Sequence, residues 1–225
     1  MERVPVAGEP LAVCRRHFPC AELHMEGRKE FFYSWRVTGS AKAEVTYSDY
    51  MADAPVDTVC SLVDHICRRA RGHTGPEPAD VTEYLRSDGF IVTNRPTYVS
   101  RSRNLLRTAV GTHHDLYDSV QRLLDSGLLE PSDVDNSYIS WTRRGNTRRV
   151  GFCSTMFRVV GISSALDSPD IPDPVRDYVV YHECLHLRQG YRPGHRHHDA
   201  EFRVSERSFP GWRDAEAVLR GLGSR

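Results

Sequence analysis

Two histidines four residues apart, with a glutamate directly after the first, stand in the segment "YHECLHLRQGYRPGHRHHDAEFR", residues 181–203. Residues four apart lie on one face of an α-helix, so His182 and His186 can direct two imidazoles at one metal ion. Glu183 is rotated by about 100° from His182 on a helix of 3.6 residues per turn. There it can accept a proton from a water molecule without binding the metal itself. The spacing therefore predicts a metal site with Glu183 as its general base.

A catalytic zinc site needs a third protein ligand and leaves a fourth position open for water. We expect a helix to begin near Asp199 and to fold back on the first one, which would bring His198 or Glu201 to the ion. The other possible ligands in this segment are His195, His197, Asp199 and Glu206. The spacing alone does not choose among them. The alternative to a metal site is a solvated helix face followed by a His-rich loop.

The elements around these residues predict a mixed fold. Residues 174–190 form the strongest helical pattern, with a proline in the first turn and a glycine at the end. Three segments before it, residues 138–141, 149–153 and 157–162, have the composition of strands, and "RRGNTRR" reads as the turn after the first. We therefore expect an α+β fold, in which a small antiparallel three-stranded sheet packs on the helix that carries the histidines.

A weak internal repeat links the two halves of the chain. Shifted by 117 positions, residues 45–65 align without gaps on residues 162–182, with four identities. The identical pairs are Asp53 and Asp170, Pro55 and Pro172, Val63 and Val180, and His65 and His182. This pattern predicts an N-terminal α+β domain over residues 1–94 that is a degenerate copy of the domain over residues 95–225. Ile66 and Arg69 would then replace Glu183 and His186. The alternative is a chance likeness between two ordinary strand–loop–helix units.

Composition and charge narrow the class of protein. The chain has 225 residues, 39% of them hydrophobic, and a formal net charge of +0, which is typical of a folded globular protein. It contains no apolar run of the roughly 18 residues that a membrane span needs, and its first residues do not resemble a signal peptide. The cysteines form no CxxC pair. We therefore expect a cytoplasmic protein with reduced thiols and no membrane partner.

The segment "VVYHECLHLRQGYRPGHRHHDAEFRVSERSFPGW" resembles the SprT-like zinc metallopeptidases and their YgjP-like relatives, and the lead-in before it is similar to archaeal members. The resemblance covers about residues 95–220 and implies a zincin-like fold. It implies Zn²⁺ bound by His182, His186 and His198, with Glu183 as the general base. His198 is chosen because "HDAEF" matches the family's segment that supplies the third ligand. The chain departs from many members because no cysteine zinc ribbon follows the peptidase segment.

The resemblance implies a hydrolase that cleaves peptide bonds, and the family is associated with DNA–protein crosslink repair. Tyr181 and Tyr191 are near enough in sequence to contact the substrate or an oxyanion. Two basic stretches, "RPTYVSRSRNLLR" and "WTRRGNTRR", offer nucleic-acid contacts. Their candidate residues are Arg101, Arg103, Arg143, Arg144, Arg148 and Arg149. The simpler interpretation of these stretches is a solvated loop and a hairpin turn.

Two other functions stay open. The YgjP-like relatives are linked to nucleotide pyrophosphate hydrolysis, so the same site could hydrolyse nucleotides or other phosphates. The chain could also be a non-catalytic module that binds nucleic acid or protein and keeps a structural zinc. Glu183 argues against that last function, because a purely structural site has no need of a base.

Overall fold

A computed structural model describes residues 3–223 of the chain as a mixed α and β structure. The chain divides into two compact units, of which the first ends at Asn94 and the second begins at Arg95. We call them unit 1 and unit 2. Helix α4 (Asp88–Arg101) runs across this division. No helix among the described residues is long and apolar enough to cross a membrane.

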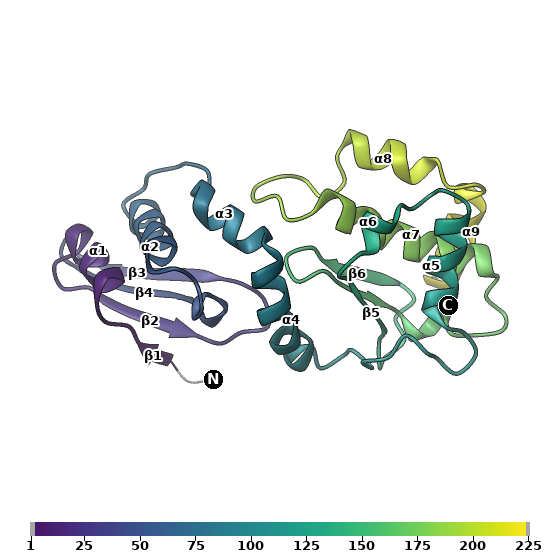
Figure 1. Cartoon of the computed structure of the whole chain (residues 1–225), viewed down its shortest axis with the longest axis horizontal. Coiled ribbons are helices and arrows are strands. Elements are labelled where there is room, and N and C mark those ends of the chain that lie inside the picture. The colour runs from purple at the N-terminus through teal and green to yellow at the C-terminus, as the bar shows by residue number, and fades with distance from the viewer. Residues whose placement is uncertain (1–2, 224–225) are drawn as a thin grey trace. The chain divides into compact units, whose positions relative to one another are not determined.

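Unit 1 is a sheet with two helices packed on one of its faces (Figure 1). The strand order is β1-β2-β4-β3, in which β2 runs parallel to β4 and the other two pairs are antiparallel. β4 lies inside the sheet between β2 and β3, and most of its residues are buried. The elements are β1 (Arg3–Pro5), α1 (Glu9–His17), β2 (Glu22–Glu26), β3 (Tyr33–Thr38), β4 (Lys42–Ser48), η1 (Asp49–Met51), α2 (Val56–Ala70) and α3 (Ala79–Arg86).

Unit 2 is built around one buried helix, α7 (Asp173–Gln189). Helices α5, α6, α8 and α9 and strands β6 and β7 all pack against it (Figure 1). This confirms the helix predicted over residues 174–190. The other elements are α5 (Leu116–Asp125), α6 (Pro131–Val134), β5 (Tyr138–Trp141), β6 (Gly151–Ser154), β7 (Val159–Ile162), η2 (Ser164–Leu166), α8 (Ala200–Arg207) and α9 (Trp212–Gly223).

The sheet of unit 2 is mixed, so the prediction of an antiparallel sheet was wrong. Its order is β5-β7-β6, with β5 parallel to β7 and β6 antiparallel to β7. The segment predicted as a hairpin turn instead crosses the end of β7, where the Asn146 amide donates to Ser163 Oγ at 2.7 Å. The glycine at position 145 fits this crossing, because a Cβ there would lie 3.1 Å from the Ala165 backbone nitrogen. The crossing leaves β6 at the edge of the sheet.

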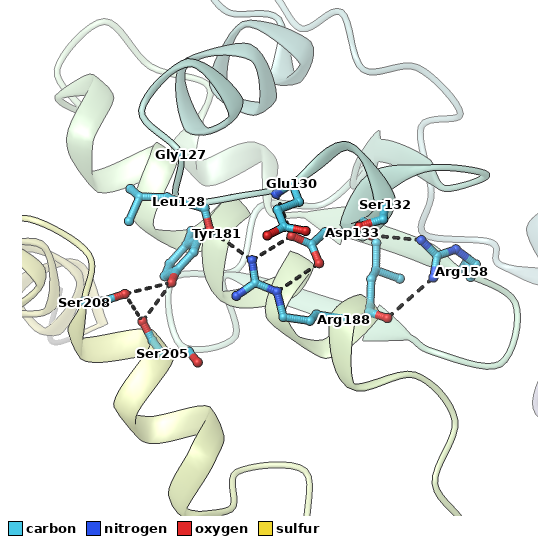
Figure 2. Close-up of a pocket in the computed structure, with 11 residues that line it drawn as sticks. Gly127, Leu128, Glu130, Ser132, Asp133, Arg158, Tyr181, Arg188, Ser205 and Ser208 are labelled. Atoms are coloured by element: carbon cyan, nitrogen blue, oxygen red, sulfur yellow. Dashed lines mark hydrogen bonds and ion pairs between the residues drawn. The ribbon is translucent and has the colours of Figure 1, made fainter.

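An ion pair ties the end of α7 to the segment that follows α5. Arg188 donates to both carboxylate oxygens of Asp133, at 2.9 and 2.6 Å, and to the carbonyl of Leu128 at 3.0 Å (Figure 2). Burial alone would raise the pKa of Asp133, but the hydrogen bonds from Arg188 and from the Glu130 amide lower it overall. The ionised carboxylate therefore stabilises the fold.

We predict that Asp133→Asn lowers the free energy of unfolding at neutral pH by about 2 kcal/mol, because Arg188 loses its charged partner in a half-buried place. The pKa of Asp133 is lower in the folded state than in the unfolded state, so this contribution is present above the unfolded pKa. It is lost as the pH falls through the folded pKa. Urea unfolding at several pH values measures the difference. Asp135→Asn, an exposed neighbour, should change stability by less than about 0.5 kcal/mol, and an equal loss in both variants would contradict the prediction.

Candidate metal centre

Three imidazoles from two elements meet beside α7. His182 and His186 lie one turn apart on α7, and His198 comes from the loop just before α8. Nε2 of His198 is 3.3 Å from Nε2 of His182 and 3.1 Å from Nε2 of His186. All three ligand atoms lie within 4.8 Å of one another, so the group could hold a metal ion.

The donor set fits a metal ion in both chemistry and spacing. Tetrahedral coordination with metal–nitrogen bonds of about 2.0–2.1 Å places ligand nitrogens roughly 3.3 Å apart. Two of the three nitrogen pairs already have that spacing. Burial and the neighbouring imidazoles lower the pKa of His186 to about 3, and burial lowers that of His198. Both imidazoles are therefore neutral at pH 7, as a metal ligand must be.

The residues after His198 hold it in place. Asp199 caps α8, where its side chain accepts a hydrogen bond from the Phe202 amide at 2.8 Å. Phe202 is buried, and its ring stacks on that of His186 with centroids 4.5 Å apart. It also contacts the rings of His182 and His198. The "HDAEF" segment thus supplies a ligand, a helix cap and an apolar support within five residues.

Glu206 orients His182 rather than competing for the metal. Its Oε1 lies 2.6 Å from Nδ1 of His182, and an ionised carboxylate can only accept, so Nδ1 is the donor. Nε2 is then left with its lone pair toward the other two imidazoles. The hydrogen bond to His182 lowers the pKa of Glu206, and it helps to raise the pKa of His182 against the effect of burial. Such a carboxylate partner strengthens a histidine ligand.

Glu183, the residue after His182 on α7, is buried, with 6% of its surface exposed. No hydrogen-bond donor among residues 3–223 reaches its carboxylate. Burial raises its pKa to about 7, while the charges of His182 and Arg149 act in the opposite direction. Gly151 at the start of β6 makes room for it, because a Cβ there would lie 2.4 Å from Oε1 of Glu183.

The other nitrogen and oxygen donors of the sequence lie outside the group of three. His195 and His197 are exposed in the loop between α7 and α8, and the His197 ring lies 6.1 Å from that of His186. Glu201 is exposed on the first turn of α8. Sequence reasoning considered Glu206 as a ligand and missed its role as a hydrogen-bond partner. The sequence did contain a signal for this role: Glu206 follows Phe202 by four residues, so the two side chains lie on one face of α8.

The hydroxyl of Tyr181 is hydrogen-bonded to α8 and the residue after it, and the substrate or oxyanion contact stays a prediction. Its ring is buried, and its hydroxyl donates to the Ser205 carbonyl at 2.8 Å and lies 3.1 Å from Ser208 Oγ. Figure 2 shows these three residues at one side of a polar pocket of about 700 Å³ that also contains Arg188 and Arg158. Tyr191 is half-buried in the loop that follows α7, close in sequence to the metal ligands.

The two basic stretches meet in unit 2. The amides of Arg143 and Arg144 donate to the carbonyl and side chain of Asn104, next to Arg103. These three arginines are exposed. Arg148 and Arg149 are also exposed, and the Arg149 guanidinium lies 5.9 Å from the ring of Phe152 on β6. Arg101 is instead the last residue of α4, a helix that the sequence did not predict.

We predict one bound divalent metal ion per chain, measured by elemental analysis after dialysis with the metal supplied. His186→Ala and His198→Ala should each lose most of it, because two imidazoles cannot complete the site. His197→Ala is the matched control in the same loop and should keep it. If His197→Ala lost the metal and His198→Ala kept it, the third ligand would be His197 and not His198.

No protein-family model matches the sequence, and neither a curated protein nor a solved structure gives a match. The function of the protein must therefore be inferred from the residues of the site itself.

Proposed function

We propose that unit 2 is a zincin-like, SprT-like peptidase domain that hydrolyses peptide bonds with zinc. The observation that carries this proposal is Glu183, a buried carboxylate without a hydrogen-bond donor that follows His182 on α7 and interacts electrostatically with it, on the helix that supplies two of the three convergent imidazoles. Burying an unpaired carboxylate costs free energy, and a structural metal site gains nothing from it. A pKa near 7 is what a general base needs at neutral pH.

The roles of the residues follow from their places. His182, His186 and His198 would hold the zinc through Nε2, and Glu206 would keep His182 in the required orientation. Zinc, when bound, is a Lewis acid that makes water acidic near neutral pH and polarises a carbonyl group. Glu183 would accept the proton of the attacking water and then deliver it to the leaving amine nitrogen.

The edge position of β6 supports a polypeptide substrate. No other described strand pairs with β6 on its side away from β7. Gly151 on this strand touches Glu183, so an extended chain paired to β6 would pass next to the base. Strand addition of this kind recognises a peptide backbone, whereas a nucleotide has no backbone to pair.

Glu183→Gln should lower the cleavage of an unfolded substrate such as labelled casein by at least about a hundredfold, while the bound metal is retained. Gly151→Ala should also lower it, because the added methyl group displaces the carboxylate. Glu201→Gln, which changes an exposed carboxylate on α8, is the control and should keep the activity. Full activity in Glu183→Gln would refute the proposal. An inert peptide substrate with Glu183-dependent release of phosphate from nucleotides would favour the phosphate hydrolase instead.

The arginines gathered around Asn104 support DNA-bound proteins as substrates. Basic residues outnumber acidic ones in residues 95–225, although the whole chain is neutral. We expect Arg143→Glu combined with Arg144→Glu to weaken the binding of a labelled oligonucleotide by about tenfold. Arg15→Glu combined with Arg16→Glu, an exposed pair on α1, is the matched control. Equal weakening by both pairs in fluorescence anisotropy would show a general charge effect and no binding site.

A further inference from the structure

Units 1 and 2 share an order of elements and a pattern of strand pairing. In unit 1 the order is α1, β2, β3, β4, η1 and α2, and in unit 2 it is α5, β5, β6, β7, η2 and α7, with only the short α6 inserted. In each, the first strand is parallel to the third, and the second is antiparallel to the third at the sheet edge. In each, the first helix packs on the last.

The shift of 117 positions also matches individual contacts. Pro55 and Pro172 both precede the last helix of their unit in the same extended conformation, with φ and ψ of −52° and 139°, and −58° and 142°. Arg71 donates to the carbonyl of His17 at the end of α1, and its counterpart Arg188 donates to the carbonyl of Leu128 after α5. An arginine at the end of the helix thus fixes the same connection in both units.

The register of the strands identifies what stands in unit 1 at the place of the metal centre. Val45 pairs with Trp35, and its counterpart Ile162 pairs with Gly151. Trp35 therefore takes the place of the glycine that makes room for Glu183. On α2, His65 replaces His182, Ile66 replaces Glu183 and Arg69 replaces His186. Unit 1 has neither the base nor the second imidazole at these positions.

Aromatic and cationic side chains are found there instead. Tyr33 stacks on Trp35 with ring centroids 6.4 Å apart and contacts the ring of His65 at 6.1 Å. Trp35 is 39% exposed. Arg36 and Arg69 are exposed, and their side chains make no hydrogen bond or ion pair with another described residue.

We propose that unit 1 is an inactive duplicate of the fold of unit 2, and that its β3 edge binds an extended polypeptide segment with acidic side chains. The segment would add to the sheet as a strand along β3, which no described strand pairs on its outer side. Trp35 and Val37 share the face of β3 that lies toward α2, and Arg36 lies on the opposite face. Apolar side chains of the segment would contact Trp35 and Val37, and acidic side chains on the other side of the added strand would pair with Arg36. Arg69 of α2 would attract an acidic side chain on the Trp35 side.

A polypeptide suits this surface better than a nucleic acid. Acidic residues outnumber basic ones in residues 1–94, so the unit as a whole does not attract a polyanion. Two local arginines are enough to select carboxylates on a chain whose backbone provides most of the binding. The inference rests on the proposed peptidase function for the kind of ligand, since a second peptide-binding edge would hold the substrate of unit 2.

The test uses the full chain with Glu183→Gln, so that no peptide is cut. The probe is a fluorescent peptide of about ten residues in which valine alternates with glutamate. The valines of this peptide would contact Trp35, so its glutamates would all face Arg36. Arg36→Glu should therefore weaken its binding at least about tenfold and favour the same peptide with lysine in place of glutamate. Arg68→Glu is the control, because Arg68 is equally exposed but paired with Asp64 at 3.0 Å, and it should leave binding within about twofold.

Backbone methylation of the peptide tests the strand geometry. An added strand uses the N–H groups of alternate residues on the side that faces its neighbour. N-methylation of one alternate set should abolish binding, while methylation of the other set should be tolerated. Equal affinity for both methylated peptides, or no effect of Arg36→Glu, would overturn the proposal. If unit 1 instead bound an oligonucleotide, and this binding depended on Arg36 and Arg69, the ligand of this surface would be a nucleic acid and not a peptide. Failure of casein cleavage would refute the peptidase function alone, because the present measurement needs no cleavage.

Discussion

The burial of α7 on nearly all sides is the constraint on which unit 2 depends. A helix surrounded by other elements is normally apolar all round, yet α7 carries Arg176, Asp177, Glu183 and His186 among its buried residues. Some of these groups are satisfied by neighbours, as Asp177 is by Arg122 at 2.7 and 2.8 Å. Others lack a full set of partners, because Nε and Nη1 of Arg176 and Nδ1 of His186 are buried without a hydrogen bond to another described residue. The same packing that stabilises the unit therefore fixes the imidazoles to within a narrow range of positions.

Glu183 shows the cost of this arrangement. Its side chain packs against Gly151 at the start of β6, only 6% of the residue is exposed, and no described residue donates a hydrogen bond to it. A well-packed apolar side chain would be the more stable choice at this position, and unit 1 has isoleucine there. In the proposed duplication, the two units share one scaffold, and only unit 2 has a carboxylate at this position of the helix. Stability and chemistry compete at a single position of the helix.

Local patterns in the sequence predicted the local parts of the structure. The helix that carries His182 and His186 follows from periodicity and helix-end residues, and its existence was therefore predictable. The order of the strands was not, because alternation predicts a strand but not its neighbour, and the loop over residues 142–150 was interpreted as a hairpin. Spacing left the third imidazole open, and the resemblance to a known motif pointed to His198. The role of Glu206 depends on how α8 packs on α7, which no local pattern contains.

The cap on α8 has a consequence for how this protein can vary. Asp199 fixes the start of α8 directly after His198, and Phe202 anchors that start against the rings of α7. His198 is therefore held from its C-terminal side by Asp199 and Phe202, whereas most of the loop over residues 191–197 is exposed. Insertions in that loop would be tolerated, whereas one added residue between His198 and Phe202 would turn the imidazole away from its partners. The number of residues after His198 is thus fixed by α8, whereas the number of residues before it can vary.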